Sequence, residues 1–250
     1  MAMDRVPTGV YGLDELIQGG FPKKRVILVS GACGTGKSIF SMQFLYRGAI
    51  EYEEPGVFVT FDEMPSKIRQ DMSTFGWDLT ELEKNNYLAI IDATSARAGT
   101  TSEEEHAILP TQLDFDRLLL DIVSCCKQTE AKRLVIDSIP AMAFRLNNQN
   151  EIRQAILKLA YVVAKAGITT IMTSEVPEHG EGLPAQISKY EVEEYVADGV
   201  ILLDFIIGGG DTTRSLYIRK MRGTKHSLEM HPFQITDKGI VVRKVEDVIK

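Results

Sequence analysis

Short apolar segments recur along the chain and are separated by longer amphipathic ones. The apolar segments are rich in β-branched residues and have the length of strands, at 25–31, 56–62, 87–93, 133–138, 168–175 and 199–207. Helical periodicity is clearest between them, at 37–51, 65–75, 112–129 and 151–166. Alternation of strands with helices is typical of a parallel sheet joined by crossover helices, so the pattern predicts a doubly wound α/β fold.

The pattern changes after the glycine-rich segment 208–211. Segments 214–223 and 233–242 then resemble short hairpin strands, which predicts antiparallel strands at one edge of the sheet. No internal repeat and no linker rich in Pro, Gly or Ser is visible, so we expect a single domain over residues 1–250. The polar, weakly periodic segment 93–111 is expected to be a solvated surface loop.

Composition narrows the classes of function. The chain has 250 residues with 44% hydrophobic composition and a formal net charge of -7, so it can bury a large core and does not attract nucleic acid or anionic membranes as a whole. Its apolar runs are far shorter than the roughly 20 residues of a membrane span, and its N-terminus has no apolar signal region. Three cysteines and four scattered histidines match no disulfide or metal-ligand spacing. These features predict a cytoplasmic protein whose only metal arrives with a ligand.

The sequence GACGTGKS, from Gly31 to Ser38, matches the phosphate-loop (Walker A) pattern G-x-x-x-x-G-K-[ST] in full. It follows a predicted strand and opens a predicted helix, which is the context that the motif requires. Glycines allow backbone N–H groups to face phosphate oxygens, and the helix N-terminus adds positive charge. Lys37 would then bridge the β- and γ-phosphates of ATP, and the Ser38 hydroxyl would bind Mg²⁺. A glycine turn without a ligand is the structural alternative.

Acids at two strand ends could complete this chemistry. Asp137 ends an apolar strand and is expected to hold water ligands of Mg²⁺, with capping of the next loop as the alternative. Asp62 and Glu63 are adjacent at the end of another strand, where two carboxylates repel each other unless they serve Mg²⁺ or water. We therefore expect this pair to act on the attacking water, although either acid could instead cap the helix that starts near Pro65.

Together these motifs resemble the RecA-superfamily ATPases of the KaiC type. The resemblance rests on the phosphate loop and on VTFDEMPSKIRQDMSTFGWDL, KRLVIDS, TTIMTSE, EVEEYVADGVILL and KMRGTKHSLEMHPFQITDKGI, in one order from about Thr8 to Val242. It implies a RecA-like P-loop NTPase core, with a twisted mostly parallel sheet flanked by helices, in a single-domain member of the family. It also implies a homo-oligomeric, hexameric ring that binds ATP at its subunit interfaces.

The resemblance assigns residues to both sides of such an interface. The phosphate side matches Gly34, Thr35, Gly36, Lys37, Ser38 and Ile39, and Thr74 matches a position near the adenosine. The side of the neighbouring subunit matches Lys220, Met221, Arg222, Thr224, His226, Thr236 and Asp237. Asp62 and Glu63 match the catalytic glutamate pair of the family, but the first acid is Asp here, one methylene shorter. Which of the two is the base therefore stays open.

The basic segment 217–227, YIRKMRGTKHS, supports the second assignment independently. Side chains two apart in a strand share a face, so Lys220 and Arg222 should point together, about 7 Å apart. Arg219 and Met221 should point the other way. Two cations on one face suit a triphosphate, and Arg provides the planar fork of an arginine finger. A solvated edge strand that its cations protect from aggregation is the alternative.

These observations favour an ATP-hydrolysing, hexameric regulatory ATPase that uses Mg²⁺. Asp62 and Glu63 would act on water within one subunit, and Lys220 with Arg222 would act from its neighbour. The protein partner that responds to the bound ATP or ADP is not evident from the sequence.

Two other functions remain as alternatives, an ATP-binding scaffold that does not hydrolyse and a DNA recombinase. The loop 176–194 carries five acids against one lysine, which argues against DNA, because DNA affinity comes mainly from Lys and Arg. Autokinase activity is not expected either. Glu193 and Glu194 lie in the stretch where phosphorylating KaiC domains carry Ser or Thr.

Overall fold

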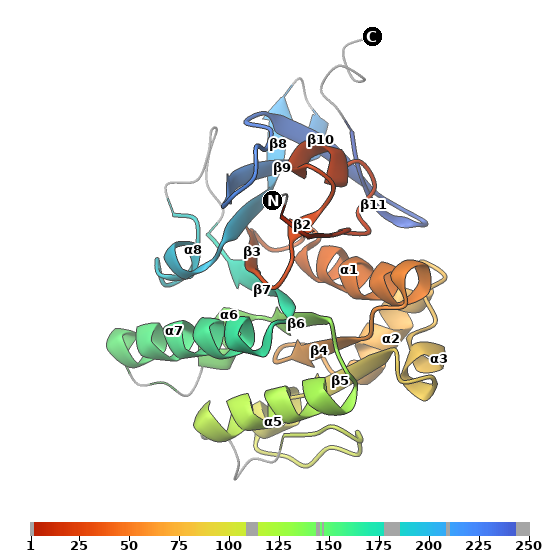
Figure 1. Cartoon of the computed structure of the whole chain (residues 1–250), viewed down its shortest axis with the longest axis vertical. Helices are drawn as coiled ribbons and strands as arrows, with labels where there is room; N and C mark the ends of the chain where they lie inside the picture. The colour runs from red at the N-terminus through yellow and green to blue at the C-terminus, as the bar shows by residue number, and fades with distance from the viewer. Residues whose placement is uncertain are drawn as a thin grey trace.

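A nine-stranded sheet runs through the middle of the molecule (Figure 1). The structure is a computed structural model, and it describes residues 3–108, 115–143, 146, 148–177, 186–208 and 211–243. The strands lie in the order β11-β10-β9-β8-β3-β7-β6-β4-β5. Those from β8 to β5 pair in parallel, and β9, β10 and β11 pair antiparallel at the other side. The predicted α/β fold, with a mostly parallel core and antiparallel C-terminal edge strands, is confirmed.

The elements have the following bounds. The large sheet contains β3 (Val26–Gly31), β4 (Gly56–Thr60), β5 (Leu88–Asp92), β6 (Arg133–Asp137), β7 (Thr169–Glu175), β8 (Gly199–Gly208), β9 (Asp211–Met221), β10 (Met230–Thr236) and β11 (Gly239–Val242). A separate pair contains β1 (Arg5–Val6) and β2 (Phe21–Pro22). The helices are the 3-10 helix η1 (Asp14–Ile17), α1 (Lys37–Tyr52), α2 (Pro65–Ser73), α3 (Leu79–Lys84), α4 (Thr94–Ala98), α5 (Phe115–Gln128), α6 (Ile139–Met142), α7 (Gln149–Ala166) and α8 (Glu193–Val196). The four predicted helices are confirmed as α1, α2, α5 and α7.

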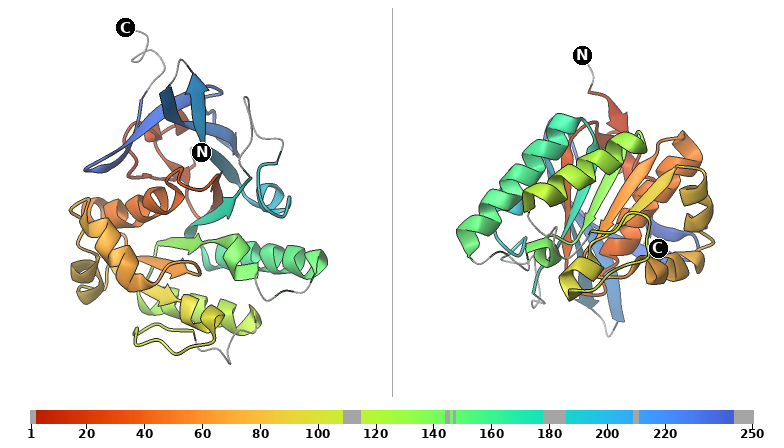
Figure 2. Two further views of the ribbon diagram at one scale, coloured as in Figure 1. Left: turned by 180° about the vertical axis from the view of Figure 1, so that it is seen from behind. Right: turned by 90° about the horizontal axis from the view of Figure 1, so that it is seen from below.

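Helices cover both faces of the sheet, as strands with apolar residues on both sides require. Helices α1, α2 and α3 pack on one face, and α5 and α7 pack on the other (Figure 2). Strand β4 illustrates the division, because Phe58 joins the first core while Val57 and Val59 join the second. Among the described residues, no helix is long and apolar enough to cross a membrane.

The order of the parallel strands brings the candidate chemistry to one edge. The end of β3 lies beside the end of β7, where Gly31 pairs with Glu175. The end of β4 lies beside the end of β6, where Thr60 pairs with Asp137. Ligands of open α/β sheets bind outside the carboxyl ends of their strands. The loops after these four strands therefore define where a site is expected.

The polar segment 93–111 differs from its predicted form as a solvated loop. It begins with α4, in which Ala96 is fully buried, and Ile108 is only 4% exposed. Asp92 forms an isolated bridge with Ala107, so the segment folds back onto the end of β5. Residues 109–111 lie outside the described part of the chain. The five-residue helix α4 is too short to produce a periodic signal, which explains the incomplete prediction.

A buried arginine fixes helix α1 against the sheet. This is the helix that follows the phosphate loop. Arg133 of β6 is fully buried, and its Nη1 donates hydrogen bonds to the carbonyl oxygens of Phe44 at 2.8 Å and Pro7 at 2.9 Å. Its guanidinium also forms an ion pair with Glu54 at 2.7 Å. A Cβ atom on Gly48 of α1 would lie 2.3 Å from Arg133 Nε. Glycine at this position is thus required by a close approach.

Replacement of Gly48 by alanine is therefore expected to destabilise the fold. Alanine normally stabilises a helix interior relative to glycine, by about 0.5–1 kcal/mol. Here the added methyl group overlaps a buried guanidinium, and overpacking typically costs about 1–3 kcal/mol. Chemical denaturation should give a lower free energy of unfolding for Gly48→Ala than for the wild type. An equal or higher value would contradict the close approach of Arg133.

Candidate functional site

The phosphate loop connects β3 to α1 in the backbone shape that its glycines permit. Gly34 and Gly36 have φ angles of 77° and 102°, in the left-handed region that glycine favours. Helix α1 begins directly afterwards at Lys37, so its first N–H groups point toward the loop. Thr35 is fully buried and donates a hydrogen bond from Oγ1 to the carbonyl of Ala32 at 2.9 Å. The loop is thus shaped to present backbone donors to an anion.

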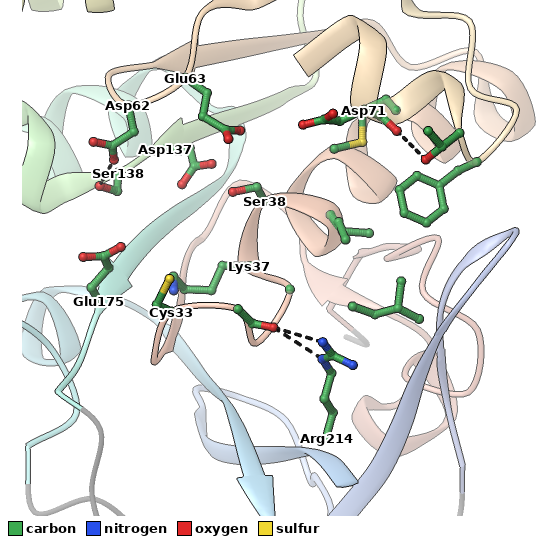
Figure 3. Close-up of a pocket in the computed structure, with 17 residues that line it drawn as sticks. Cys33, Lys37, Ser38, Asp62, Glu63, Asp71, Asp137, Ser138, Glu175 and Arg214 are labelled. Carbon is green, nitrogen blue, oxygen red and sulfur yellow. Dashed lines mark hydrogen bonds between the residues drawn. The ribbon is translucent and has the colours of Figure 1, made fainter. Parts of the chain in front are cut away.

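A pocket of about 560 Å³ lies over this loop, within the usual size range of small-molecule sites. Figure 3 shows it between the phosphate loop, the strand ends and helix α2. Its lining includes Cys33, Gly34, Gly36, Lys37, Ser38, Ile39, Asp62, Glu63, Asp71, Met72, Thr74, Phe75, Asp137, Ser138, Glu175, Arg214 and Ile235. The phosphate loop and the acids predicted from the strand ends therefore meet in one cavity.

Lys37 is a cation of this pocket that lies among backbone carbonyls and nearby carboxylates. Its Nζ donates hydrogen bonds to the carbonyl oxygens of Gly31 and Ala32, both at 2.9 Å. Burial lowers the pKa of the Lys37 ammonium, and the negative charges of Glu175 and Asp137 raise it. Backbone carbonyls and nearby acids thus hold a cation where the motif places the phosphates. Glu175, the last residue of β7, also lines the pocket.

Asp137 and Ser38 offer two hard oxygen ligands at one point. Asp137 accepts hydrogen bonds from Thr173 Oγ1 and from Ser38. Burial raises the pKa of Asp137, and these two hydrogen bonds lower it. A divalent cation would compensate the desolvated carboxylate, and Mg²⁺ prefers oxygen ligands together with water and phosphates. The pair therefore fits Mg²⁺, and no group of three or more His, Cys, Asp or Glu side chains in the described ranges could hold a metal alone.

The two adjacent acids after β4 diverge. Asp62 accepts hydrogen bonds on both carboxylate oxygens, from Ser138 Oγ at 2.7 Å and from Arg97 Nη1 at 2.6 Å. Glu63 instead extends into the pocket (Figure 3). Burial raises the pKa of Glu63, and the neighbouring carboxylates of α2 and β6 raise it further. The two acids thus have different surroundings although they are adjacent in the chain.

Helix α2 and the residues that follow it line another side of the pocket. Thr74 follows the last residue of this helix as its C-cap and donates a hydrogen bond from Oγ1 to the carbonyl of Asp71 at 2.6 Å. Met72 and Phe75 line the same side, and Phe75 packs on Trp77 with ring centroids 5.1 Å apart. An aromatic and apolar wall suits the base and ribose of a nucleotide. Thr74 lines the pocket with this wall, and its position near the adenosine stays a prediction.

The two cations of the basic segment lie away from this pocket. Lys220 Nζ donates hydrogen bonds to the carbonyl oxygens of Glu194 at 2.9 Å and Ala197 at 2.7 Å. Arg222 lies 3.5 Å from Asp198 in an ion pair. Neither is among the described residues that line the pocket. Within one subunit, therefore, these cations contact the end of α8 and not the phosphate loop.

The alternation predicted for this segment is present with one irregularity. Lys220 and Arg222 contact the same α8 segment, whereas Met221 between them is 4% exposed and packs in the core. A β-bulge between β8 and β9 leaves Arg219 without a partner in the register, and its side chain is exposed. The two cations therefore lie together, as predicted.

The N-terminal segment orders the loop that follows the two cations. Arg5 donates hydrogen bonds to Thr224 Oγ1 at 2.6 Å and to the carbonyl of Gly223 at 3.3 Å. Gln18 accepts a hydrogen bond from the backbone N–H of Lys225 at 3.0 Å. His226 Nδ1 lies 2.9 Å from the carbonyl of the next residue. Thr224 and His226, like Met221, are outside the described lining of the pocket.

Thr236 and Asp237 occupy the turn between β10 and β11. Thr236 Oγ1 donates a hydrogen bond to the carbonyl of Gly239 at 2.9 Å, and Asp237 is exposed. The preceding residue, Ile235, lines the pocket of the same subunit, and its Cδ1 lies close above Gly36. This turn thus lies nearer to the phosphate loop of its own chain than the cations do. A role for Thr236 and Asp237 from the neighbouring side stays a prediction.

Sequence reasoning missed several residues of the site. Arg214 of β9 lines the pocket, donates to the carbonyl of Gly34 at 3.3 Å, and lies over the ring of Phe205. Ser138 and Arg97 hold Asp62. The alternation in β9 could have identified Arg214, which shares the parity of buried core residues. Nothing local could have identified Arg97, because its partner Asp62 lies in the loop after another strand, 35 positions away.

A parallel sheet with a phosphate loop after its central strand, acids after neighbouring strands and an antiparallel extension defines a RecA-like P-loop NTPase. The family model described as "ATPase: KaiC" matches residues 6–247. The chain therefore belongs to the KaiC family of ATPases, as a nucleotide-binding member of the RecA superfamily.

Three relatives illustrate this membership. A UPF0273 protein of Methanocaldococcus jannaschii is 40% identical over 243 residues, which cover 96% of each chain. The circadian clock oscillator protein KaiC of Prochlorococcus marinus is 37% identical over 97% of this chain but only 45% of its own length. The crystal structure of a KaiC-like protein from Pyrococcus horikoshii has a TM-score of 0.84 and 41% identity, covering 97% of this chain and all of that one. The chain thus resembles a complete single-domain relative and about half of a clock protein.

Proposed function

We propose that this chain is an ATPase of one domain, spanning residues 1–250, that hydrolyses ATP with Mg²⁺ between subunits of a homo-oligomeric, six-membered ring and thereby regulates a protein partner. The observation that carries the proposal is the convergence of Lys37, Ser38, Asp137 and Glu63 in one pocket over the phosphate loop. A cation, two magnesium ligands and a carboxylate facing the cavity are the groups that phosphoryl transfer to water requires.

The residues have distinct tasks in this reaction. The loop N–H groups and Lys37 hold the β- and γ-phosphates, and Thr74 with the apolar wall holds the nucleoside. Magnesium bound through Ser38 and Asp137 would neutralise charge on the β- and γ-phosphate oxygens. One acid of the Asp62–Glu63 pair orients the attacking water and accepts its proton. The water oxygen bonds to the γ-phosphorus as the bond to the β-bridging oxygen breaks, which yields ADP and phosphate.

The pocket of one subunit lacks the second set of cations that the resemblance assigns to it. Lys220 and Arg222 lie beyond the described lining and are held at the end of α8. In the proposed ring they would meet the triphosphate bound by the adjacent subunit. An arginine placed there stabilises the negative charge of the transition state.

Phosphate release from Mg-ATP by the purified chain tests this function. We expect turnover above the protein-free background. Because Mg²⁺ held by Ser38 and Asp137 would neutralise charge on the β- and γ-phosphate oxygens, its removal by EDTA should lower phosphate release by at least about a hundredfold. Excess MgCl₂ added after the EDTA should restore it. Turnover that is unchanged by EDTA would contradict the roles of Ser38 and Asp137.

An ATP-binding scaffold without hydrolysis is the second candidate, and one contact favours it. The carboxylate of Asp62 accepts hydrogen bonds from Arg97 and Ser138 on its two oxygens. A carboxylate held in this way is less available to orient an attacking water. A chain that binds ATP in equilibrium dialysis but releases no phosphate with Mg²⁺ would support the scaffold. Measurable turnover would exclude it.

A further inference from the structure

A salt bridge from helix α4 reaches one acid of the adjacent pair. Arg97 Nη1 lies 2.6 Å from Asp62 Oδ1, and the same nitrogen donates to the carbonyl of Phe61 at 3.1 Å. The other oxygen, Asp62 Oδ2, accepts a hydrogen bond from Ser138 Oγ at 2.7 Å. Arg97 Nη1 thus contacts both the backbone carbonyl of Phe61 and the side chain of Asp62, the next residue. The Asp62 carboxylate is held by a donor on each oxygen.

The helix that carries Arg97 is itself fixed in place. The Oδ1 atom of Asp92 accepts hydrogen bonds from the N–H and the hydroxyl of Thr94, at 2.8 and 2.6 Å, at the start of α4. Farther along the segment, Glu104 forms an ion pair with Arg69 of α2 at 2.7 Å. The donor therefore comes from an anchored element, which allows it to define the direction of the carboxylate.

Glu63 has no comparable restraint. No described residue donates a hydrogen bond to its carboxylate, and the Thr60 hydroxyl bonds only to the Glu63 backbone. The charged groups that face Glu63 are Asp71 and Lys67 of α2, Asp137 of β6 and the adjacent Asp62. Figure 3 shows Glu63 extending into the pocket while Asp62 turns toward Ser138. One acid is held and the other is available to a water molecule.

We propose that Arg97 is a positioning residue that divides the pair, because with Ser138 it keeps Asp62 fixed and leaves Glu63 as the base that orients the attacking water. The inference rests on the proposed hydrolysis of ATP. Glu63 takes one proton from the water as the oxygen bonds to the γ-phosphorus, and ADP leaves with the electron pair of the broken bond. Without Arg97, an uncompensated Asp62 carboxylate would repel Glu63 and could turn into the same space.

Phosphate release by four variants tests this division. Glu63→Gln should lower kcat by at least about a hundredfold, as loss of a general base does, whereas Asp62→Asn should lower it less than about fivefold. Arg97→Ala should lower kcat about tenfold through the misplaced Asp62, with the Kd for ATP changed less than about threefold. When position 62 is Asn, kcat should no longer depend on Arg97. The double variant Asp62→Asn with Arg97→Ala should therefore have a kcat less than about twofold below that of Asp62→Asn alone.

Two further variants separate positioning from loosening of the segment. Glu104→Gln weakens the ion pair between this segment and Arg69 without changing the contacts of Asp62. It should leave kcat within about twofold of the wild type. Arg97→Lys, which restores a cation, should recover part of the activity that Arg97→Ala loses. If Arg97→Ala does not fold, Arg97→Gln takes its place, since it keeps much of the side-chain stem.

The outcomes distinguish this inference from the proposed function. If the wild type hydrolyses ATP but Asp62→Asn and Glu63→Gln are equally impaired, the division of the pair is overturned and the proposed hydrolysis is not. An equal effect of Arg97→Ala with Asp or Asn at position 62 would overturn the positioning role. A wild type that binds ATP and releases no phosphate would overturn both the hydrolysis and the inference.

Discussion

Replacement of Lys37 by alanine is expected to reduce ATP turnover by about a hundred- to a thousandfold, the usual cost of losing one preorganised donor to transition-state charge. Lys37 Nζ is held by the carbonyl oxygens of Gly31 and Ala32, at the base of the pocket. In the proposed reaction its ammonium would be the cation that the phosphate loop of the same subunit supplies to the γ-phosphate. The measurement is phosphate release from Mg-ATP at saturating and at limiting nucleotide concentrations.

A lysine remote from the pocket provides the matched control for this prediction. Lys127 is exposed near the end of α5, outside the described lining of the pocket, so Lys127→Ala should leave turnover unchanged. Both variants should retain the thermal transition of the wild type, which shows that a loss of turnover does not reflect unfolding. Turnover of folded Lys37→Ala within tenfold of the wild type would contradict the assigned role of the phosphate loop.

Much of the fold and part of the site could be predicted from local patterns. The alternation of apolar strands and helices defines a parallel sheet, and the end of each strand then lies at a common edge. For that reason the phosphate loop, Asp137 and the pair Asp62 and Glu63 could be expected to converge, and they line one pocket. Each of these predictions needed only a motif or a strand end.

The parts that could not be predicted depend on which strands are neighbours. Asp62 is held by Arg97, 35 positions away on the segment after β5, and by Ser138, 76 positions away after β6. Strand β4 lies between β5 and β6 in the sheet, and no local pattern specifies that order. Arg214 likewise reaches the phosphate loop across 180 positions. Non-local packing therefore determines how each acid is used, while local sequence determines that the acids are present.

An equal mixture of Lys37→Ala and Arg222→Ala chains is expected to regain turnover that each variant lacks alone. Arg222→Ala should lose at least about a thousandfold in kcat if Arg222 is an arginine finger. In a randomly mixed ring, about one interface in four joins an intact phosphate loop from one variant to an intact Arg222 from the other. Under the proposed function such an interface is complete, because Arg222 lies outside the described lining of its own pocket and would be supplied by a neighbour.

Arg219, an arginine of β9 three positions before Arg222, is the control for this experiment. Arg219 is exposed at the β-bulge and is not paired in the register, so Arg219→Ala should keep turnover within about threefold of the wild type, as surface substitutions usually do. Native mass measurement must show that the two variants share rings before the mixture is assayed. Mixed rings without recovered turnover would refute action across the interface, since every ring would then contain complete sites that do not work. Recovery near a quarter of the wild-type rate would instead locate the catalytic unit at the contact between two subunits, with the basic segment as the part that each subunit contributes to its neighbour.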